Sequence, residues 1–266
     1  MPFTQRLHAP LVAAALLLAA LPARVRADAP PTHEQLVAMV HTLDERQRSP
    51  GDYRVLAYIE AKEKDKTDTA QEAIIYRRNS DRKLMILFTK PKSQAGKGYL
   101  RLDRNLWFYD PTVGKWERRT DRERINGTDS RREDFDESHL AEDYEVAFGG
   151  EAKLGKYATS LLDLKVKSGK DVAYPVAKLW LDKSNGTLLK RQDFALSGRL
   201  MRTLYYPHWD KLFSDSKKSE VWFPAEIRIY DEIEKANSTV VKLQDPDLHA
   251  LEANIFTKAW LEAKSR

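Results

Sequence analysis

The feature that most constrains the fold is a close succession of short segments in which apolar and polar residues alternate. Between residues 73 and 119 these segments are 73–77, 83–89, 98–102, 106–109 and 116–119. A period of two is typical of β-strands. The connections, such as Asn79-Ser80-Asp81 and Asp110-Pro111, are rich in turn-forming residues and too short for crossovers, so we expect antiparallel hairpins.

Two of these segments are apolar on both faces. Leu84, Ile86 and Phe88 alternate with apolar neighbours, and the run Leu106-Trp107-Phe108-Tyr109 has no polar residue. One face of a strand normally packs in the protein's own core, so the second face needs a helix, a partner or a ligand as cover. The pattern fits a barrel with an apolar cavity and a barrel filled by its own side chains equally well.

The rest of the chain predicts few helices. Thr32 and Gln35 form a capping box ahead of apolar residues at helical spacing, which predicts an N-terminal helix of about four turns. A charged stretch, 122–142, is predicted to be a loop with a short helix, anchored by Phe135, Leu140 and Tyr144. A short helix over 255–261 is expected to close the chain.

A second set of strands begins near Glu145. Asn185-Gly186 and Ser197-Gly198 are strong hairpin signals, residues 200–206 form a strand, residues 210–220 a loop, and 221–230 and 238–243 the last hairpin. We therefore expect about ten to twelve strands in a closed or half-closed antiparallel β-barrel with helices against it.

The N-terminus has the three parts of a secretory signal: Arg6, an apolar run over 11–21, and Val25-Arg26-Ala27. We expect cleavage after Ala27 and one soluble domain over residues 28–266. Without Arg6, Arg24 and Arg26, the chain keeps 42 basic and 40 acidic residues, a net charge of +2, which gives little attraction for nucleic acid. An exported chain with no cysteine fits a bacterial periplasm best.

Motifs for chemistry are sparse. The histidines form no metal-binding pattern, there is no GxSxG nucleophile motif, and Ala95-Gly96-Lys97-Gly98 lacks the spacing of a phosphate-binding loop. The acidic run 133–137 could supply paired carboxylates for a hydrolase, but Arg131 and Arg132 flank it, and a helix start is the better interpretation. We expect no enzyme, no metal and no cofactor.

An ordered set of residues resembles a known family. The set comprises Phe88-x-x-Pro91, Gly96-x-Gly98-Tyr99-Leu100, Leu106-Trp107-Phe108-Tyr109-x-Pro111, Lys115, Arg118, Asp134-Phe135 to Leu140, and the ending Ile255-Phe256-Thr257-x-x-x-Leu261. It is similar to the LolA-like periplasmic outer-membrane lipoprotein-sorting proteins, and most similar to their uncharacterised branch.

The resemblance implies a half-open antiparallel barrel with a helical lid, whose apolar interior holds acyl chains of a lipid or lipoprotein. It implies a partner in the inner membrane, a transporter of the ABC or RND/MMPL type, and only transient membrane contact. Phe135 and Leu140 are the expected lid residues. The expected cavity residues are Val55, Ala57, Ile59, Leu84, Ile86, Phe88, Leu100, Leu102, Leu106, Trp107, Phe108, Tyr109, Leu162, Leu164 and Val166.

Two alternatives stay open at this point. On a similar fold, the chain could be a periplasmic sensor or regulator that binds a membrane protein. The acidic run near Asp134 keeps a carboxylate-based hydrolase as the third hypothesis.

Overall fold

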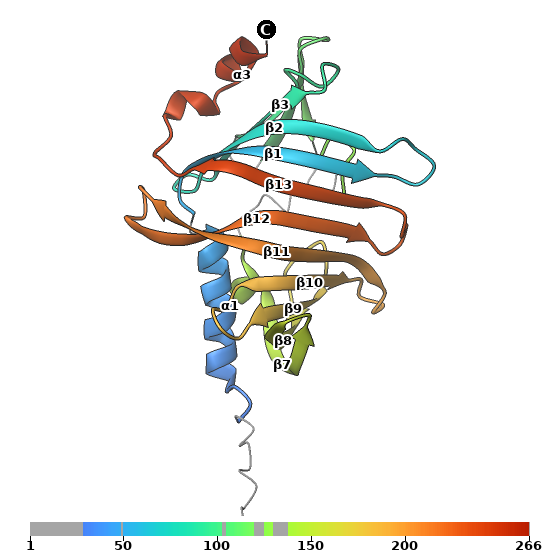
Figure 1. Cartoon of the computed structure of the whole chain (residues 1–266), viewed down its shortest axis with the longest axis vertical. Helices are drawn as coiled ribbons and strands as arrows, with labels where there is room; N and C mark the ends of the chain where they lie inside the picture. Colours follow the sequence, from blue (N-terminus) through green and yellow to red (C-terminus); the bar gives the residue numbers. More distant parts are fainter. Residues whose placement is uncertain (1–28, 49, 103–104, 120–124, 130–137, 266) are drawn as a thin grey trace, which may run out of the picture.

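The computed structural model describes residues 29–48, 50–102, 105–119, 125–129 and 138–265. These residues form thirteen strands in one curved sheet, in the order β6-β5-β4-β3-β2-β1-β13-β12-β11-β10-β9-β8-β7 (Figure 1). Every neighbouring pair is antiparallel. The predicted half-open antiparallel β-architecture with few helices is confirmed, with slightly more strands than expected.

The elements have the following bounds. The strands are β1 (Tyr53–Lys62), β2 (Thr69–Arg78), β3 (Lys83–Lys90), β4 (Gly98–Leu102), β5 (Asn105–Asp110), β6 (Lys115–Arg119), β7 (Tyr144–Leu154), β8 (Tyr157–Val166), β9 (Val176–Asp182), β10 (Leu188–Phe194), β11 (Leu200–Ser214), β12 (Ser219–Asp231) and β13 (Ser238–Asp247). The helices are α1 (His33–Arg48), α2 (Leu140–Asp143), the 3-10 turn η2 (Ala253–Phe256) and α3 (Lys258–Lys264).

Helix α1 begins at the predicted capping box. The backbone N–H of Thr32 donates to Gln35 Oε1 at 2.8 Å, and the N–H of Gln35 donates to Thr32 Oγ1 at 3.3 Å. These two bonds satisfy backbone donors that a helix start leaves without partners. Leu36, Val40 and Leu43 are buried, so this face of α1 packs against the sheet, and Figure 1 shows the helix behind the strands.

The hairpin signals at Asn185-Gly186 and Ser197-Gly198 are confirmed as turns between β9 and β10 and between β10 and β11. Gly186 and Gly198 have φ angles of 70° and 81°, which a residue with a side chain rarely adopts. These two turns fix the register of strands that carry both apolar and charged interior residues.

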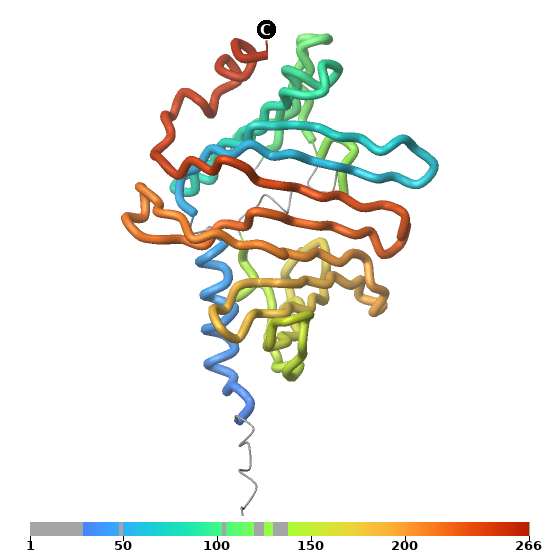
Figure 2. The backbone as a smooth tube through the Cα atoms, in the orientation of Figure 1, coloured from blue at the N-terminus to red at the C-terminus, as the bar shows by residue number. Residues whose placement is uncertain are grey.

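The predicted loop over 210–220 is wrong, because β11 continues to Ser214 and β12 begins at Ser219. The strand continues through Pro207, although proline has no N–H for a sheet. The pairing of β11 with β12 shifts register on both sides of His208, and this irregularity accommodates the proline. Figure 2 shows the resulting long hairpin extending beyond its neighbours.

The two edges of the sheet, β6 and β7, are consecutive in the chain. The connection between them includes α2 and the described residues 125–129. We call residues 125–129 the interior segment. The central pairing joins β1 to the last strand, β13. Within the described residues, no helix combines the length and the apolar character needed to cross a membrane.

A buried ion cluster joins β10 to β11. Arg191 Nε and Arg202 Nε each donate to one carboxylate oxygen of Asp193 at 2.7 Å, and the Asp193 side chain is fully buried. Burial lowers the pKa of Arg191, but the charge and the hydrogen bond of Asp193, together with Tyr206, outweigh this effect and leave the pKa above its ordinary value. Arg202 also lies over the Tyr174 ring, with 4.5 Å from its Cζ to the ring centroid. The cluster therefore ties the loop before β9 to β10 and β11.

We predict that Asp193→Asn lowers the free energy of unfolding by about 3–5 kcal/mol, because two guanidinium groups lose their buried counter-charge. Urea denaturation followed by circular dichroism measures the change. Asp163→Asn is the matched control. The Asp163 side chain is 41% exposed and pairs with Lys178, so we expect the free energy of unfolding to fall by less than about 1 kcal/mol. Equal effects of the two substitutions would contradict a stabilising role for the cluster.

Candidate functional site

One face of the sheet is continuous from β5 to β8, and the strand register defines it. Ile59 pairs with Val241, which pairs with Ile227; on the same face, two residues along, Ile229 pairs with Leu204. The row continues through Arg191, Leu179 and Leu162. We call this side the interior face, because α1 packs on it, and the opposite side the outer face.

The half of the interior face over β1 to β5 carries a large apolar cluster, which we call the β1–β5 cluster. Its buried members are Val55, Ala57, Ile59, Ala73, Ile75, Leu84, Ile86, Phe88, Tyr99, Leu106, Ile125, Phe223 and Val241. Phe108 is partly buried against it. Ile125 belongs to the interior segment, so this segment covers part of the cluster.

The interior segment is held mainly by polar contacts. The N–H of Asn126 donates to the Tyr99 hydroxyl at 3.1 Å, and its side-chain Nδ2 donates to Gln71 Oε1 at 2.5 Å. The N–H of Asp129 donates to Thr239 Oγ1 at 2.8 Å. Ile125 is the apolar anchor described in this segment. A cover held by hydrogen bonds that water can replace costs less to displace than one held by apolar packing.

The other half of the interior face is covered by helices. Leu36, Val40 and Leu43 of α1 and Leu140 of α2 pack on Leu162, Leu164, Leu179 and their neighbours, which we call the helix-covered cluster. Val166 is partly buried against it.

Strands β3 to β5 have a second apolar cluster on the outer face, under η2 and α3. Its buried members are Tyr76, Met85, Leu87, Leu100, Phe256 and Leu261. Trp116 Nε1 donates to Glu262 Oε1 at 2.6 Å, and Lys258 Nζ lies 4.0 Å from the centroid of the Trp107 ring. The C-terminal helices therefore cover one apolar face of β5, while Leu106 and Phe108 lie on the interior face.

The predicted cavity residues fall into three places. Those in or against the β1–β5 cluster are Val55, Ala57, Ile59, Leu84, Ile86, Phe88, Leu106 and Phe108. Those in or against the helix-covered cluster are Leu162, Leu164 and Val166. Those on the outer face beneath the C-terminal helices are Leu100, Leu102, Trp107 and Tyr109.

Of the two predicted lid residues, Leu140 is buried in the helix-covered cluster and Phe135 lies outside the described residues. The acidic run 133–137 also lies outside them, so the hydrolase hypothesis stays a prediction.

Sequence reasoning missed Asp44, which connects α1 to α2. Its buried carboxylate accepts hydrogen bonds from the backbone N–H groups of Leu140 at 2.9 Å and Ala141 at 2.8 Å, and from the Ser138 hydroxyl. It thereby satisfies the free donors at the start of α2 and complements their positive partial charge. A single aspartate in an amphipathic helix gives no local signal of a partner more than ninety residues away.

We predict that Asp44→Ala loosens α2, because at least two backbone donors lose their acceptor, at a cost of about 1–2 kcal/mol. Amide hydrogen exchange of residues 138–143 should become faster than in the wild type. Glu45→Ala, which removes the next, exposed carboxylate of α1, is the control and should leave the exchange unchanged. Unchanged exchange in Asp44→Ala would show that α2 does not depend on this contact.

The sequence matches one family model, and the fold matches several solved structures. Residues 80–263, more than half of the chain, match a family model described as an uncharacterized protein. No curated protein matches the chain in sequence.

Solved structures share the fold. A LolA superfamily protein from Nitrosomonas europaea is 21% identical, with a TM-score of 0.68 over 85% of this chain and 98% of that chain. A domain named as an outer membrane lipoprotein-sorting protein, from Vibrio parahaemolyticus, is 18% identical, with a TM-score of 0.72 over 87% and 100% of the two chains. A DUF1329 family protein from Desulfovibrio piger is 18% identical, with a TM-score of 0.74 over 86% and 98%. The chain thus belongs to the family of uncharacterised proteins whose model it matches, and its fold is that of these LolA superfamily, lipoprotein-sorting and DUF1329 structures.

Proposed function

We propose that this protein is a non-enzymatic periplasmic carrier that shields the acyl chains of a lipid or lipoprotein on the interior face of its sheet. The observation that carries the proposal is the β1–β5 cluster, a buried apolar cluster on the interior face of a half-open sheet, part of which lies under a segment held mainly by polar contacts. The shared fold supports it, since the Vibrio parahaemolyticus structure of that fold is named for outer membrane lipoprotein sorting.

The physical need for such a carrier follows from the cost of exposing a lipid to water. An acyl chain of about sixteen carbons costs on the order of 13 kcal/mol, at about 0.8 kcal/mol per methylene. A protein that shields the chain removes most of this cost, but it must also release the chain at its destination. Moderate complementarity and a weakly held cover satisfy both requirements.

The interior face offers both properties. Side chains such as Ile86, Phe88 and Phe108 are aliphatic or aromatic and make non-directional contacts, so they suit an alkyl chain of variable structure. Displacing Asn126 and Asp129 exchanges their hydrogen bonds for bonds to water, whereas Ile125 alone exposes apolar surface. The acyl chain in turn would cover the surface that Ile125 leaves.

The cellular setting is part of the proposal. A cleaved signal over residues 1–27 would bring the chain to the periplasm, and an inner-membrane transporter of the ABC or RND/MMPL type would supply or receive the lipid. The charged, nearly balanced composition of the remaining chain suits transient contact with membranes.

Co-purification tests the proposal directly. Native mass spectrometry of the protein purified from a Gram-negative host should show bound lipid, released on denaturation as a defined mass. Protein that stays empty after incubation with phospholipid vesicles would overturn the proposal.

Neighbouring residues on opposite faces of β5 give a matched pair of variants. Phe108→Glu places a carboxylate on the interior face beside Arg119, which lies over the Phe108 ring, and should weaken the binding of dansyl-undecanoic acid at least about tenfold, because an acyl chain that covers these charges desolvates both and loses the contact with the ring. Tyr109→Glu, on the outer face, should leave probe binding unchanged when circular dichroism confirms the fold. Equal affinity of both variants would remove the interior face from the site.

A further inference from the structure

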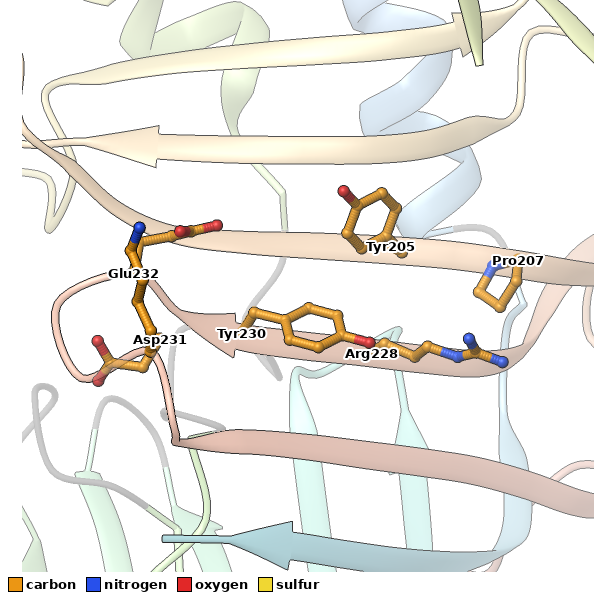
Figure 3. A pocket seen from close by; sticks show the side chains of 7 residues that line it. Tyr205, Pro207, Arg228, Tyr230, Asp231 and Glu232 are labelled. Carbon is orange, nitrogen blue, oxygen red and sulfur yellow. The ribbon is translucent and has the colours of Figure 1, made fainter. Parts of the chain in front are cut away.

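The outer face of the sheet has a second concave site, unrelated to the acyl-chain surface. It is an open groove of about 580 Å³ over β11 and β12, lined by Tyr205, Pro207, Arg228, Tyr230, Asp231, Glu232 and Lys235 (Figure 3). Leu204 and Ile229 alternate with these residues and are buried on the interior side. A ligand in the groove therefore could not contact the β1–β5 cluster.

Two tyrosines form the apolar part of the groove. The rings of Tyr205 and Tyr230 meet edge to face, with centroids 5.9 Å apart and an interplanar angle of 83°. Tyr230 is 37% exposed, which is high for a large side chain in the middle of a sheet. Lys190 lies 5.6 Å from the Tyr205 ring centroid and 4.3 Å from that of Trp180, so its ammonium group stabilises the aromatic wall.

Polar groups of both charges surround these rings. Glu232 Oε1 accepts a hydrogen bond from Thr203 Oγ1 at 2.5 Å, which holds the carboxylate at the end of the groove. Arg228 Nε donates to Glu226 Oε1 at 2.5 Å, and Figure 3 shows the Tyr230 hydroxyl directed toward Arg228. The positive charge of Arg228 is thus offset by Glu226, and Asp231 and Glu232 line the same groove as Lys235.

These features exclude several occupants. The backbones of β11 and β12 are paired with strands on both sides, so a peptide cannot add as another strand. The balanced charges give little net attraction for an anion or a cation. A purely apolar ligand would leave Arg228 and Glu232 desolvated beside it, at considerable cost.

We propose that the groove binds a neutral saccharide, with one sugar ring on the tyrosine pair. A pyranose has an apolar C–H face that can lie on an aromatic ring and a rim of hydroxyl groups that both donate and accept. The second oxygen of Glu232 and the guanidinium of Arg228 offer the acceptor and the donors that adjacent hydroxyl groups require. Burial, Glu232 and Tyr230 raise the pKa of Tyr205, so its hydroxyl stays neutral and able to donate at physiological pH.

Three neutral disaccharides test this proposal: maltose, cellobiose and N,N′-diacetylchitobiose. Saturation-transfer NMR on the purified protein should show at least one of them bound, with transfer strongest to the C–H protons of one ring face. Tyr230→Ala and Tyr205→Ala should each weaken binding about tenfold, while Tyr230→Phe keeps most of it because the ring remains. Glu232→Gln should weaken binding less than loss of either ring.

Tyr58→Ala is the matched control, since Tyr58 lies on the outer face of β1 and hydrogen-bonds Glu60. It should leave saccharide binding unchanged, and none of the groove variants should change the amount of co-purified lipid, which separates this site from the carrier function. The proposal is overturned if no disaccharide binds at concentrations up to about 20 mM. It also fails if binding persists unchanged in both alanine variants, or if the groove instead binds a protein partner and no sugar.

Discussion

Burial on both sides of β3 and β5 is the constraint from which much of the architecture follows. A strand with apolar residues at odd and even positions cannot lie at a surface on either face. The C-terminal helices cover the outer face of these strands, where Leu261 and Phe256 pack on Leu100 and Met85. On the interior face, the curvature of the sheet brings residues of β1, β2 and β13 into one cluster with the apolar residues of β3 and β5.

The two halves of the interior face are covered in different ways. Where α1 lies, the sheet and the helix fill the space between them, and the contact of Asp44 with α2 extends that cover. Over β1 to β5, the contribution of the interior segment is small and largely polar. The helix-covered cluster and the β1–β5 cluster that we assign to cargo therefore occupy separate halves of the interior face.

The sequence allowed prediction of features that depend on nearby residues. The capping box of Thr32 and Gln35 and the turn at Asn185-Gly186 are local devices, and both are found as expected. The length of β11 was not predictable, because Pro207 is a strand breaker unless a register shift accommodates it. The sequence also did not predict on which face of the sheet a side chain lies. Leu100 and Phe108 are both apolar, and the position of α3 on the outer face distinguishes them. Asp44 and the groove over Tyr205 and Tyr230 arise from contacts between distant segments.

The strand order has one consequence for the connection between β6 and β7. The chain leaves the sheet at β6, on one edge, and re-enters at β7, on the other, and between these strands Ile125 packs in the β1–β5 cluster. This connection is covalently fastened at both ends, yet no pairing between the described strands depends on it. A break in the polypeptide between these two strands would leave every strand pair of the described sheet intact. The strand pairs of the sheet and the residues 125–129 that lie on the β1–β5 cluster thus belong to separate lengths of chain, so substitutions in one need not disturb the other.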